Sequence, residues 1–493
     1  MATGFMGRKS ELAFLGERLE KARASGGGVA VAISGRRQVG KSRLVQEFCD
    51  DAGVPYLYYT AARGAPPGEA VRRFLAQLRE SALAAASAVA VPGAVPASGA
   101  VRAPGEAAGG WPGALRALAA ALPESPSVVV LDEFPWLTEQ DTLLDSALQA
   151  AWDRLLSQRP VLLLLLGSDP QMISRLAAVE RPLCDPADAL VLQPLNPAEV
   201  GAALSLGAAD AIDAHLVSGG LPGILRAWPA GRPARELAED ACQDPASPLF
   251  VVPEAALMAE FPAPDASRRV IEAIGGGSRT HAAVAAAAGG GPAAIPSGTL
   301  SPLLSQLIAG KRLLAMDEPL STRGGKPALY RVADSSLRFH LEIGRAAQEW
   351  ARRGRPASGA AHVRRYWASW RARAVEPVIR QALSQAADDL PWPGAVAVGG
   401  WWTRTFEATI DLVGADRSPG ARSVFYAGSV TWLSRPFDDR DLAALRRNAP
   451  FVPGFDPWAT GLVAVSLGGF SAAAAGRLAV RWGPEEVVAA YPA

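Results

Sequence analysis

The residues best suited to chemistry lie in two short segments, a glycine-bounded loop at 35–42 and a pair of carboxylates at 132–133. The loop spells G-x-x-x-x-G-K-S, a pattern whose backbone N–H groups can surround phosphate oxygens. Lys41 would reach the β- and γ-phosphates of a nucleotide, and the Ser42 hydroxyl would hold Mg²⁺. Only five of the 49 basic residues in the chain are lysines, so chance poorly explains a lysine at this position.

The predicted nucleotide-binding residues form one continuous run. They are Gly35, Arg36, Arg37, Gln38, Val39, Gly40, Lys41, Ser42 and Arg43. The two glycines allow backbone dihedrals that a Cβ would forbid, and the positive end of the helix that follows adds to the field attracting an anion. The alternative is an accidental Gly-Lys-Ser in a surface turn.

The acidic pair follows four apolar residues, 128–131, which predict a buried strand. Asp132 and Glu133 would then lie at the carboxyl end of that strand, the edge at which ligands bind in open α/β sheets. We expect Asp132 to bind Mg²⁺ through water and Glu133 to polarise the water that attacks the γ-phosphate. Capping of the next helix is the alternative role for this pair.

Ser168 ends another apolar segment, 160–168, and so would reach the same edge. It could sense the γ-phosphate, or it could cap the helix expected to follow. We keep both roles open and count Ser168 as a candidate catalytic residue beside Glu133 and Lys41.

Five apolar segments predict the sheet that would position these residues. They are 29–34, 54–61, 128–131, 160–168 and 189–192. Helical spacing of apolar residues at 12–19 and 71–78 predicts helices between or before them. The alternation predicts an α/β fold, a P-loop NTPase parallel sheet with helices on both faces. A stretch from about 84 to 110 has low complexity and is expected to be an insertion.

Composition narrows the class of protein. The 493 residues predict about three domains, and a net charge of +1 gives no global attraction to nucleic acid or acidic lipid. Three scattered cysteines (Cys49, Cys184 and Cys242) favour a reducing compartment. The apolar stretch 81–101 contains two prolines and suits a linker better than a membrane span. We therefore expect a cytoplasmic protein without a membrane segment.

Six segments, in order, resemble the archaeal and bacterial ATPase family of the AAA+/STAND-like P-loop ATPases. They are 5–8, 35–42, 131–137, 166–168, 192–195 and 218–222. Over residues 1–255 the resemblance implies an ATP- and Mg²⁺-dependent ATPase domain with a helical lid that contains Gly220-Leu221-Pro222. It also implies that Arg181 could touch the γ-phosphate in cis or from a neighbouring subunit; the alternative is a surface arginine.

A basic segment follows, since residues 264–373 contain 17 Lys and Arg against 7 Asp and Glu. Such asymmetry is typical of a nucleic-acid contact. Three short helices (268–274, 280–287 and 299–307) and a hairpin (312–316 with 328–332) predict a winged-helix module at 256–350. A protein–protein helical module with solvated arginines is the alternative.

Residues 360–493 resemble the family's C-terminal DUF234-type domain, which is related to PD-(D/E)XK nucleases and is a small α+β fold. Asp411 matches the first metal position, and Glu376 could be an auxiliary acid. The expected Glu-x-Lys reads Ser429-Val430-Thr431, so we expect no nuclease activity unless a shifted register brings Asp416 or Glu407 into use.

Together these features predict a Mg²⁺-dependent, ATP-hydrolysing regulatory switch whose nucleotide state controls C-terminal interaction modules. A DNA-binding regulator with ATP as a structural ligand is one alternative, and an ATP-dependent, DNA-cleaving defence or toxin-like protein is another. The expected partners are ATP, DNA through 264–373, and a protein or second copy through the C-terminal domain.

Overall fold

The computed structural model describes residues 5–86, 109–168, 172, 176, 183–263, 265–289, 295, 298–325 and 327–492. They divide into two compact units, Arg8–Gln193 and a second that joins Met1–Gly7 to Pro194–Ala493. Most of the predicted insertion at 84–110 lies outside the described residues, and so does Arg181. The helices expected to form a lid, from 194 to 255, pack within the second unit.

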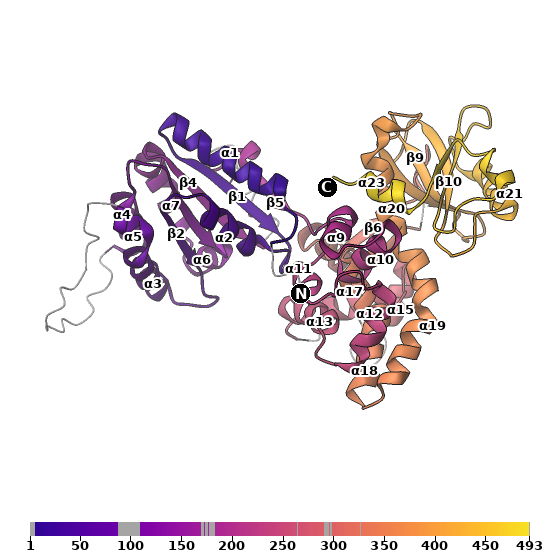
Figure 1. Ribbon diagram of the computed structural model, residues 1–493, viewed down its shortest axis with the longest axis horizontal. Helices are drawn as coiled ribbons and strands as arrows, with labels where there is room; N and C mark the ends of the chain where they lie inside the picture. Colours follow the sequence, from indigo (N-terminus) through magenta and orange to yellow (C-terminus); the bar gives the residue numbers. More distant parts are fainter. Residues whose placement is uncertain are drawn as a thin grey trace. The chain divides into compact units, whose positions relative to one another are not determined.

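The first unit contains a five-stranded parallel sheet in the order β2-β3-β4-β1-β5 (Figure 1). The strands are β1 (Val29–Gly35), β2 (Tyr56–Thr60), β3 (Ser127–Asp132), β4 (Val161–Gly167) and β5 (Ala189–Leu192). Every residue of β3 and β4 is buried, because helices cover both faces and leave no polar side to the strand. The predicted parallel α/β sheet is confirmed, and β4 lies between β1 and β3.

Helices flank this sheet on both faces. On one face, α1 (Lys9–Ser25) packs on β1 and β4, and α2 (Lys41–Asp51) packs on β1. The other face is covered by α3 (Pro67–Glu80), α5 (Gly110–Ala121), α6 (Phe134–Gln140) and α7 (Leu144–Arg154), with the short α4 (Ala82–Ala86) beside α3. There Phe74 meets Tyr59 and Trp111 edge-on, with ring centroids 5.3 and 5.5 Å apart. Such aromatic contacts hold α3 and α5 on the sheet.

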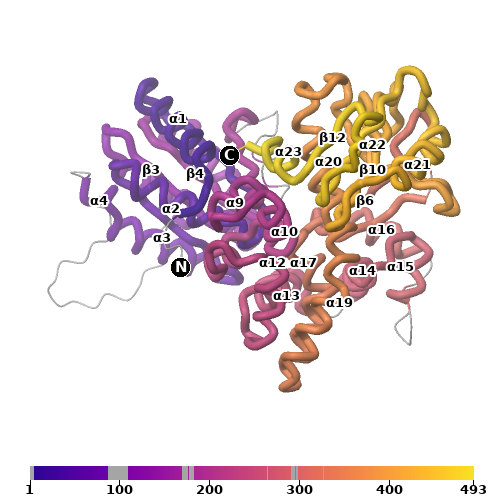
Figure 2. The backbone as a smooth tube through the Cα atoms, turned by 45° about the vertical axis from the view of Figure 1, so that its right-hand side comes forward, coloured from indigo at the N-terminus to yellow at the C-terminus, as the bar shows by residue number. Residues whose placement is uncertain are grey.

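The second unit begins with helices that pack around one apolar core. They are α9 (Pro197–Leu204), α10 (Ala208–Ser218), α11 (Pro222–Leu225), α12 (Ala234–Asp240), α13 (Pro248–Glu260), α17 (Ser335–Phe339), α18 (Arg345–Arg352) and α19 (Pro356–Ala374). Helix α12 lies along the long α19, as Figure 2 shows. Phe250, Phe339 and Trp370 are buried where these helices meet.

Three short helices and a hairpin form a smaller cluster in the same unit. They are α14 (Ala266–Gly275), α15 (His281–Ala288), α16 (Leu300–Ser305), β6 (Leu314–Asp317) and β7 (Leu329–Val332). The strands pair antiparallel, with Leu314 opposite Val332. Apolar residues from all five elements, such as Ile274, Val284 and Leu304, share one core. The three helices and the hairpin occur where the sequence predicts them.

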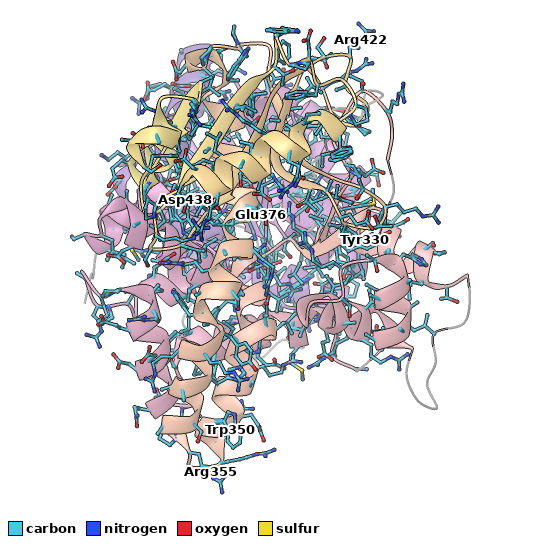
Figure 3. The ribbon with its side chains drawn as sticks, turned by 90° about the vertical axis from the view of Figure 1, so that its right-hand side faces the viewer. Tyr330, Trp350, Arg355, Glu376, Arg422 and Asp438 are labelled. Atoms are coloured by element: carbon cyan, nitrogen blue, oxygen red, sulfur yellow. The ribbon has the colours of Figure 1, made fainter. Side chains whose placement is uncertain are left out.

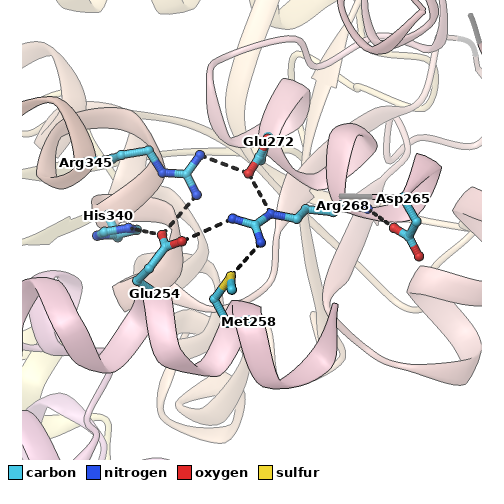
Figure 4. A network of polar contacts seen from close by, with 7 residues as sticks. All are labelled: Glu254, Met258, Asp265, Arg268, Glu272, His340 and Arg345. Atoms are coloured by element: carbon cyan, nitrogen blue, oxygen red, sulfur yellow. Dashed lines mark hydrogen bonds and ion pairs between the residues drawn. The ribbon is translucent and has the colours of Figure 1, made fainter. Parts of the chain in front are cut away.

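A network of ion pairs joins α13 to α14 and α18 (Figure 4). Glu254 accepts from Arg268 and Arg345, each at 3.1 Å, and from the buried His340 at 2.9 Å. Glu272 binds the same two arginines, each at 3.0 Å. Two carboxylates and two guanidiniums thus neutralise one another, which ties the neighbouring helices α13 and α14 to α18, some 70 residues further along the chain.

The C-terminal part is a mixed five-stranded sheet in the order β12-β11-β10-β9-β8. Its strands are β8 (Ala397–Trp402), β9 (Thr409–Ala415), β10 (Val424–Thr431), β11 (Gly461–Ser466) and β12 (Val480–Trp482). The pairs β8–β9 and β9–β10 are antiparallel, and the others are parallel. Its helices are α20 (Glu376–Gln385), α21 (Asp439–Asn448), α22 (Ala472–Ala475) and α23 (Pro484–Ala489).

The segment that leads to Glu376 is divided into two helices. Helix α19 ends at Ala374, and α20 begins at Glu376. Pro377 explains the break, because its ring clashes with the carbonyl four residues earlier and it has no N–H to donate.

Among the described residues, no single helix has both the length and the apolar character to cross a bilayer. The pair α9 and α10, bent by 106°, meets the length and composition criterion only when the two helices are taken together.

Candidate nucleotide-binding site

The loop between β1 and α2 has the backbone shape of an anion cradle. Gln38 and Gly40 have φ angles of 65° and 100°, so two residues of the loop lie in the left-handed region. The Val39 side chain is fully buried, and its N–H donates to the Arg36 carbonyl at 3.3 Å. Gly35 is required by the approach of β5, because a Cβ there would lie 2.7 Å from the Leu192 carbonyl oxygen. Packing therefore fixes the loop at both ends.

Lys41, the first residue of α2, is buried to 6% exposure and turns back over this loop. Its Nζ donates to the carbonyl oxygens of Gly35 at 2.7 Å and Arg36 at 3.1 Å. Burial lowers the pKa of Lys41, while Glu133 and Asp132 raise it. An ammonium has three donors, so two orient the group and one remains for a phosphate oxygen.

Arg8 is a part of this site that sequence reasoning did not single out. It is buried although charged, has a φ of 68°, and precedes α1. Its guanidinium pairs with Glu11 at 2.9 Å and donates to the Val39 carbonyl at 3.3 Å. Arg8 thus stabilises the loop through its hydrogen bond to the Val39 carbonyl. The Phe-Met-Gly-Arg segment was the available signal, but it does not predict the contact with Val39.

Asp132 and Glu133 lie at the carboxyl end of β3, as predicted. The Asp132 side chain is 3% exposed; its Oδ1 accepts from the Glu133 N–H at 2.9 Å and its Oδ2 from the Tyr58 hydroxyl at 2.9 Å. The Tyr58 oxygen is also 3.3 Å from the Ser42 carbonyl oxygen. Since a hydroxyl has one proton, the shorter bond to the carboxylate takes it. Tyr58 therefore donates to Asp132 and lies close to the Ser42 backbone at the start of α2, contacts that the sequence does not reveal.

Glu133 has two features of a reactive carboxylate. Its φ is 55°, a strained conformation for a residue other than glycine. Its Oε2 is buried, and no hydrogen-bond partner occurs for it in the described part of the chain. Burial raises the pKa of Glu133, and Asp132 raises it further, whereas Lys41 and Arg37 lower it. A general base benefits from such a raised pKa, because its affinity for a proton is higher.

Ser168 follows β4, the strand between the loop and the acidic pair. Gly167 lies opposite Ser34 of β1, and Leu165 lies opposite Leu131 of β3. The half-buried Ser168 therefore comes to the same sheet edge, between the two predicted halves of the site. Its role at the γ-phosphate stays a prediction, and the residues needed to judge the helix-cap alternative lie outside the described ranges. So does Arg181.

The donor set fits Mg²⁺. This ion prefers oxygen ligands, and the Ser42 hydroxyl and Asp132 carboxylate are such ligands. Tyr58 touches both Asp132 and the Ser42 backbone, so the two predicted ligands belong to one small neighbourhood.

Residues 4–165 match the family of the AAA ATPase domain. The match contains the 35–42 loop, Tyr58 and the acidic pair, and it ends within β4 of the parallel sheet. Within the first unit the match covers Arg8 to Leu165; outside it, the match includes only residues 4–7, which are grouped with the second unit. No curated protein matches the chain.

Solved structures with similarity include one protein of Pyrococcus abyssi and one of Aeropyrum pernix. A Walker-type ATPase of Pyrococcus abyssi, PABY2304, is 17% identical with a TM-score of 0.46; the alignment covers 68% of this chain and 96% of that one. The ORC2 protein of Aeropyrum pernix, in ADPNP–ADP complexes, is 14% identical with a TM-score of 0.42, over 72% and 98% of the two chains. Both TM-scores are below 0.5.

The predicted nuclease residues lie in the second unit. Asp411 on β9 accepts from the Ser429 hydroxyl at 3.0 Å and the Val430 N–H at 2.9 Å. A serine thus occupies the place next to Asp411 where a metal-binding carboxylate is expected. Glu376 pairs with Arg380 at 3.0 Å. Two further candidates have other surroundings: Asp416 binds the N–H groups of Arg422 and Ser423, and Glu407 is exposed.

Proposed function

We propose that this protein binds ATP with Mg²⁺ and hydrolyses it, and that the nucleotide state controls the C-terminal modules as a regulatory switch. The proposal of hydrolysis rests on Glu133. Its Oε2 is buried and has no hydrogen-bond partner among the described residues, and it lies at the sheet edge shared by Asp132, Lys41 and Ser42. A carboxylate with only a binding role would be expected to have its oxygens satisfied.

The roles of the residues follow from their contacts. The backbone N–H groups of the loop and the Lys41 ammonium would bind the β- and γ-phosphates. Mg²⁺ held by Ser42 and Asp132 would neutralise part of the negative charge of the phosphates. Glu133 would take a proton from the attacking water through its free oxygen, and the nearby Lys41 would stabilise the negative charge that develops on the phosphoryl oxygens.

The test is phosphate release by Glu133→Gln. Loss of a general base lowers the rate by about 10²- to 10⁴-fold, while ATP binding should persist because the loop is untouched. Glu139→Gln is the matched control, since Glu139 is exposed on the same short helix α6. Equal turnover in wild type and Glu133→Gln would refute the proposed role. Absence of ATP binding by wild type would refute the whole proposal.

We also propose a narrower DNA contact than the net charge of 264–373 suggests. Some arginines of this segment are neutralised by carboxylates from outside it, as when Glu254 binds Arg268 and Arg345. The hairpin region is different, since Arg312 and Arg323 are exposed there. If α14–α16 and the hairpin act as a winged helix, the double change Arg312→Gln and Arg323→Gln should weaken DNA binding and reduce its salt dependence. Unchanged binding would exclude this surface.

A protein partner or a second copy is proposed for the C-terminal domain. Phe451 is 59% exposed and Trp458 is 97% exposed, an unusual position for large apolar side chains. Sedimentation analysis of wild type and Trp458→Ala would detect self-association that depends on this residue.

A further inference from the structure

A cavity of about 280 Å³ lies within the second unit, where α14, the β6–β7 hairpin and the α19–α20 junction meet. Tyr330 and Glu376, both labelled in Figure 3, are among the residues that line it. Its lining contains five arginines and three carboxylates. The arginines are Arg279, Arg331, Arg338, Arg373 and Arg380, and the carboxylates are Asp317, Glu342 and Glu376.

Three of these arginines are neutralised. Arg331 pairs with Asp317 at 3.0 Å, Arg380 pairs with Glu376 at 3.0 Å, and Arg373 pairs with Glu342. These ion pairs use all three carboxylates of the lining. The cavity therefore keeps an excess of two positive charges.

The excess comes from Arg279 and Arg338. Within the residues that the structure describes, neither guanidinium has a carboxylate at ion-pair distance. Arg338 donates to the Ala374 carbonyl at 2.9 Å, but its Nε is buried without a partner. Burial lowers the pKa of Arg338 to about 10, so the group is still charged at neutral pH. The charge of Arg279 lies close enough to contribute to this lowering.

Glu342 and Glu376 are near enough to raise the pKa of Arg338, but neither carboxylate reaches it at ion-pair distance. Two guanidiniums without an ion-pair partner among the described residues are unfavourable around one cavity without an anion. Their planar N–H groups match the oxygens of a phosphate, which can accept two parallel hydrogen bonds from each. Burial also raises the pKa of Glu376, and a more easily protonated carboxyl repels an anion less. We propose that this cavity binds the phosphate group of a small phosphorylated molecule.

The shape favours a small molecule over a nucleic-acid backbone. The arginines line a recess that is partly open to solvent, in which the Arg380 side chain is 11% exposed and the Arg373 side chain 51% exposed. A backbone contact would instead use exposed arginines along a surface. A second cavity of about 360 Å³ shares Asp317, Arg331, Pro377 and Arg380 with the first. It offers room for the organic part of the ligand.

The experiment uses the full chain with Lys41→Ala, so that the 35–42 loop does not add phosphate binding of its own. Inorganic phosphate and a nucleoside monophosphate are titrated by calorimetry, first into this protein and then into the same protein with Arg279→Gln. The Arg279 side chain makes no hydrogen bond or ion pair within the described residues, so its removal should leave the fold intact. Arg355→Gln is the control, because Arg355 is an exposed arginine at the start of α19 (Figure 3).

The proposal predicts saturable binding of either probe. The affinity should fall about tenfold or more with Arg279→Gln and be unchanged with Arg355→Gln. Absence of binding, or binding that Arg279→Gln leaves unchanged, would overturn it. Binding of a 5′-hydroxyl oligonucleotide but not of either small probe would also overturn it, in favour of nucleic acid. ATP turnover by the single variant Arg279→Gln should equal that of wild type, so failure here is distinct from failure of the ATPase proposal.

Discussion

Removing the Tyr58 hydroxyl is the sharpest test of how the acidic edge is held. In Tyr58→Phe, the Asp132 Oδ2 loses the hydrogen bond that it accepts at 2.9 Å, while Oδ1 keeps the Glu133 N–H. Asp132 is 3% exposed, so water cannot easily replace the lost donor. A hydrogen bond to a charged group contributes about 1.5–3 kcal/mol to the free energy of unfolding. For a unit of this size, losing that contribution lowers the melting temperature by about 3 °C or more.

The same strand provides a matched control. The Tyr56 hydroxyl bonds to Asp50 at 3.1 Å, but on the surface, where such a contact contributes about 1 kcal/mol or less. The assay is thermal unfolding of the full chain. The transition to follow is the one whose melting temperature ATP raises in wild type, since a ligand stabilises the unit that binds it. Equal melting temperatures for Tyr58→Phe and Tyr56→Phe would refute the idea that Tyr58 secures Asp132.

Three further outcomes are expected. Burial raises the pKa of Glu133, and the charge of Arg37 lowers it. Phosphate release should therefore be lost on the acid side at a pH above 4.5, and this pH should be higher still in Arg37→Gln. An acid limb of the pH profile that does not move in Arg37→Gln would contradict this. The hydrogen bond from His340, together with the charge of Arg345, lowers the pKa of Glu254 to about 2. The ionised Glu254 side chain therefore stabilises the folded protein fully above pH 4.5, and this contribution is lost as the pH falls through 2. Glu254→Gln should therefore cost about 1–2 kcal/mol at pH 7 and progressively less below pH 4.5, measured by urea unfolding. Asp411→Asn should leave plasmid DNA as intact as wild type does, and nicking that the change abolishes would restore the nuclease alternative.

The elements of the first unit could be predicted because their signals are local. A strand buried on both faces is a continuous apolar run, and β1, β3 and β4 are such runs. The 35–42 loop is likewise a local pattern, since its glycines and lysine are needed within a few residues of one another. The hairpin of β6 and β7 could also be predicted from two apolar segments around a turn.

Other features depend on partners that are distant in the sequence. Tyr58 and Asp132 are 74 residues apart, and Arg8 and Val39 are 31 apart, so no periodicity connects them. The charge balance of 264–373 likewise omits partners that are distant in the sequence, because carboxylates such as Glu254 lie outside that segment yet bind its arginines. The DNA contact that its basic excess predicts stays a prediction.

The sequence by itself determined the strands, the phosphate loop and the carboxylates, because hydrophobic runs and glycine positions act on neighbouring residues. Only the tertiary structure decided that β4 lies between β1 and β3, which brings Ser168 between the loop and Glu133. It alone also decided which charges are neutralised and which are not, as for Arg279 and Arg338. The physical reason is that electrostatic and hydrogen-bond energies depend on distances in space, and these become defined only when the chain packs.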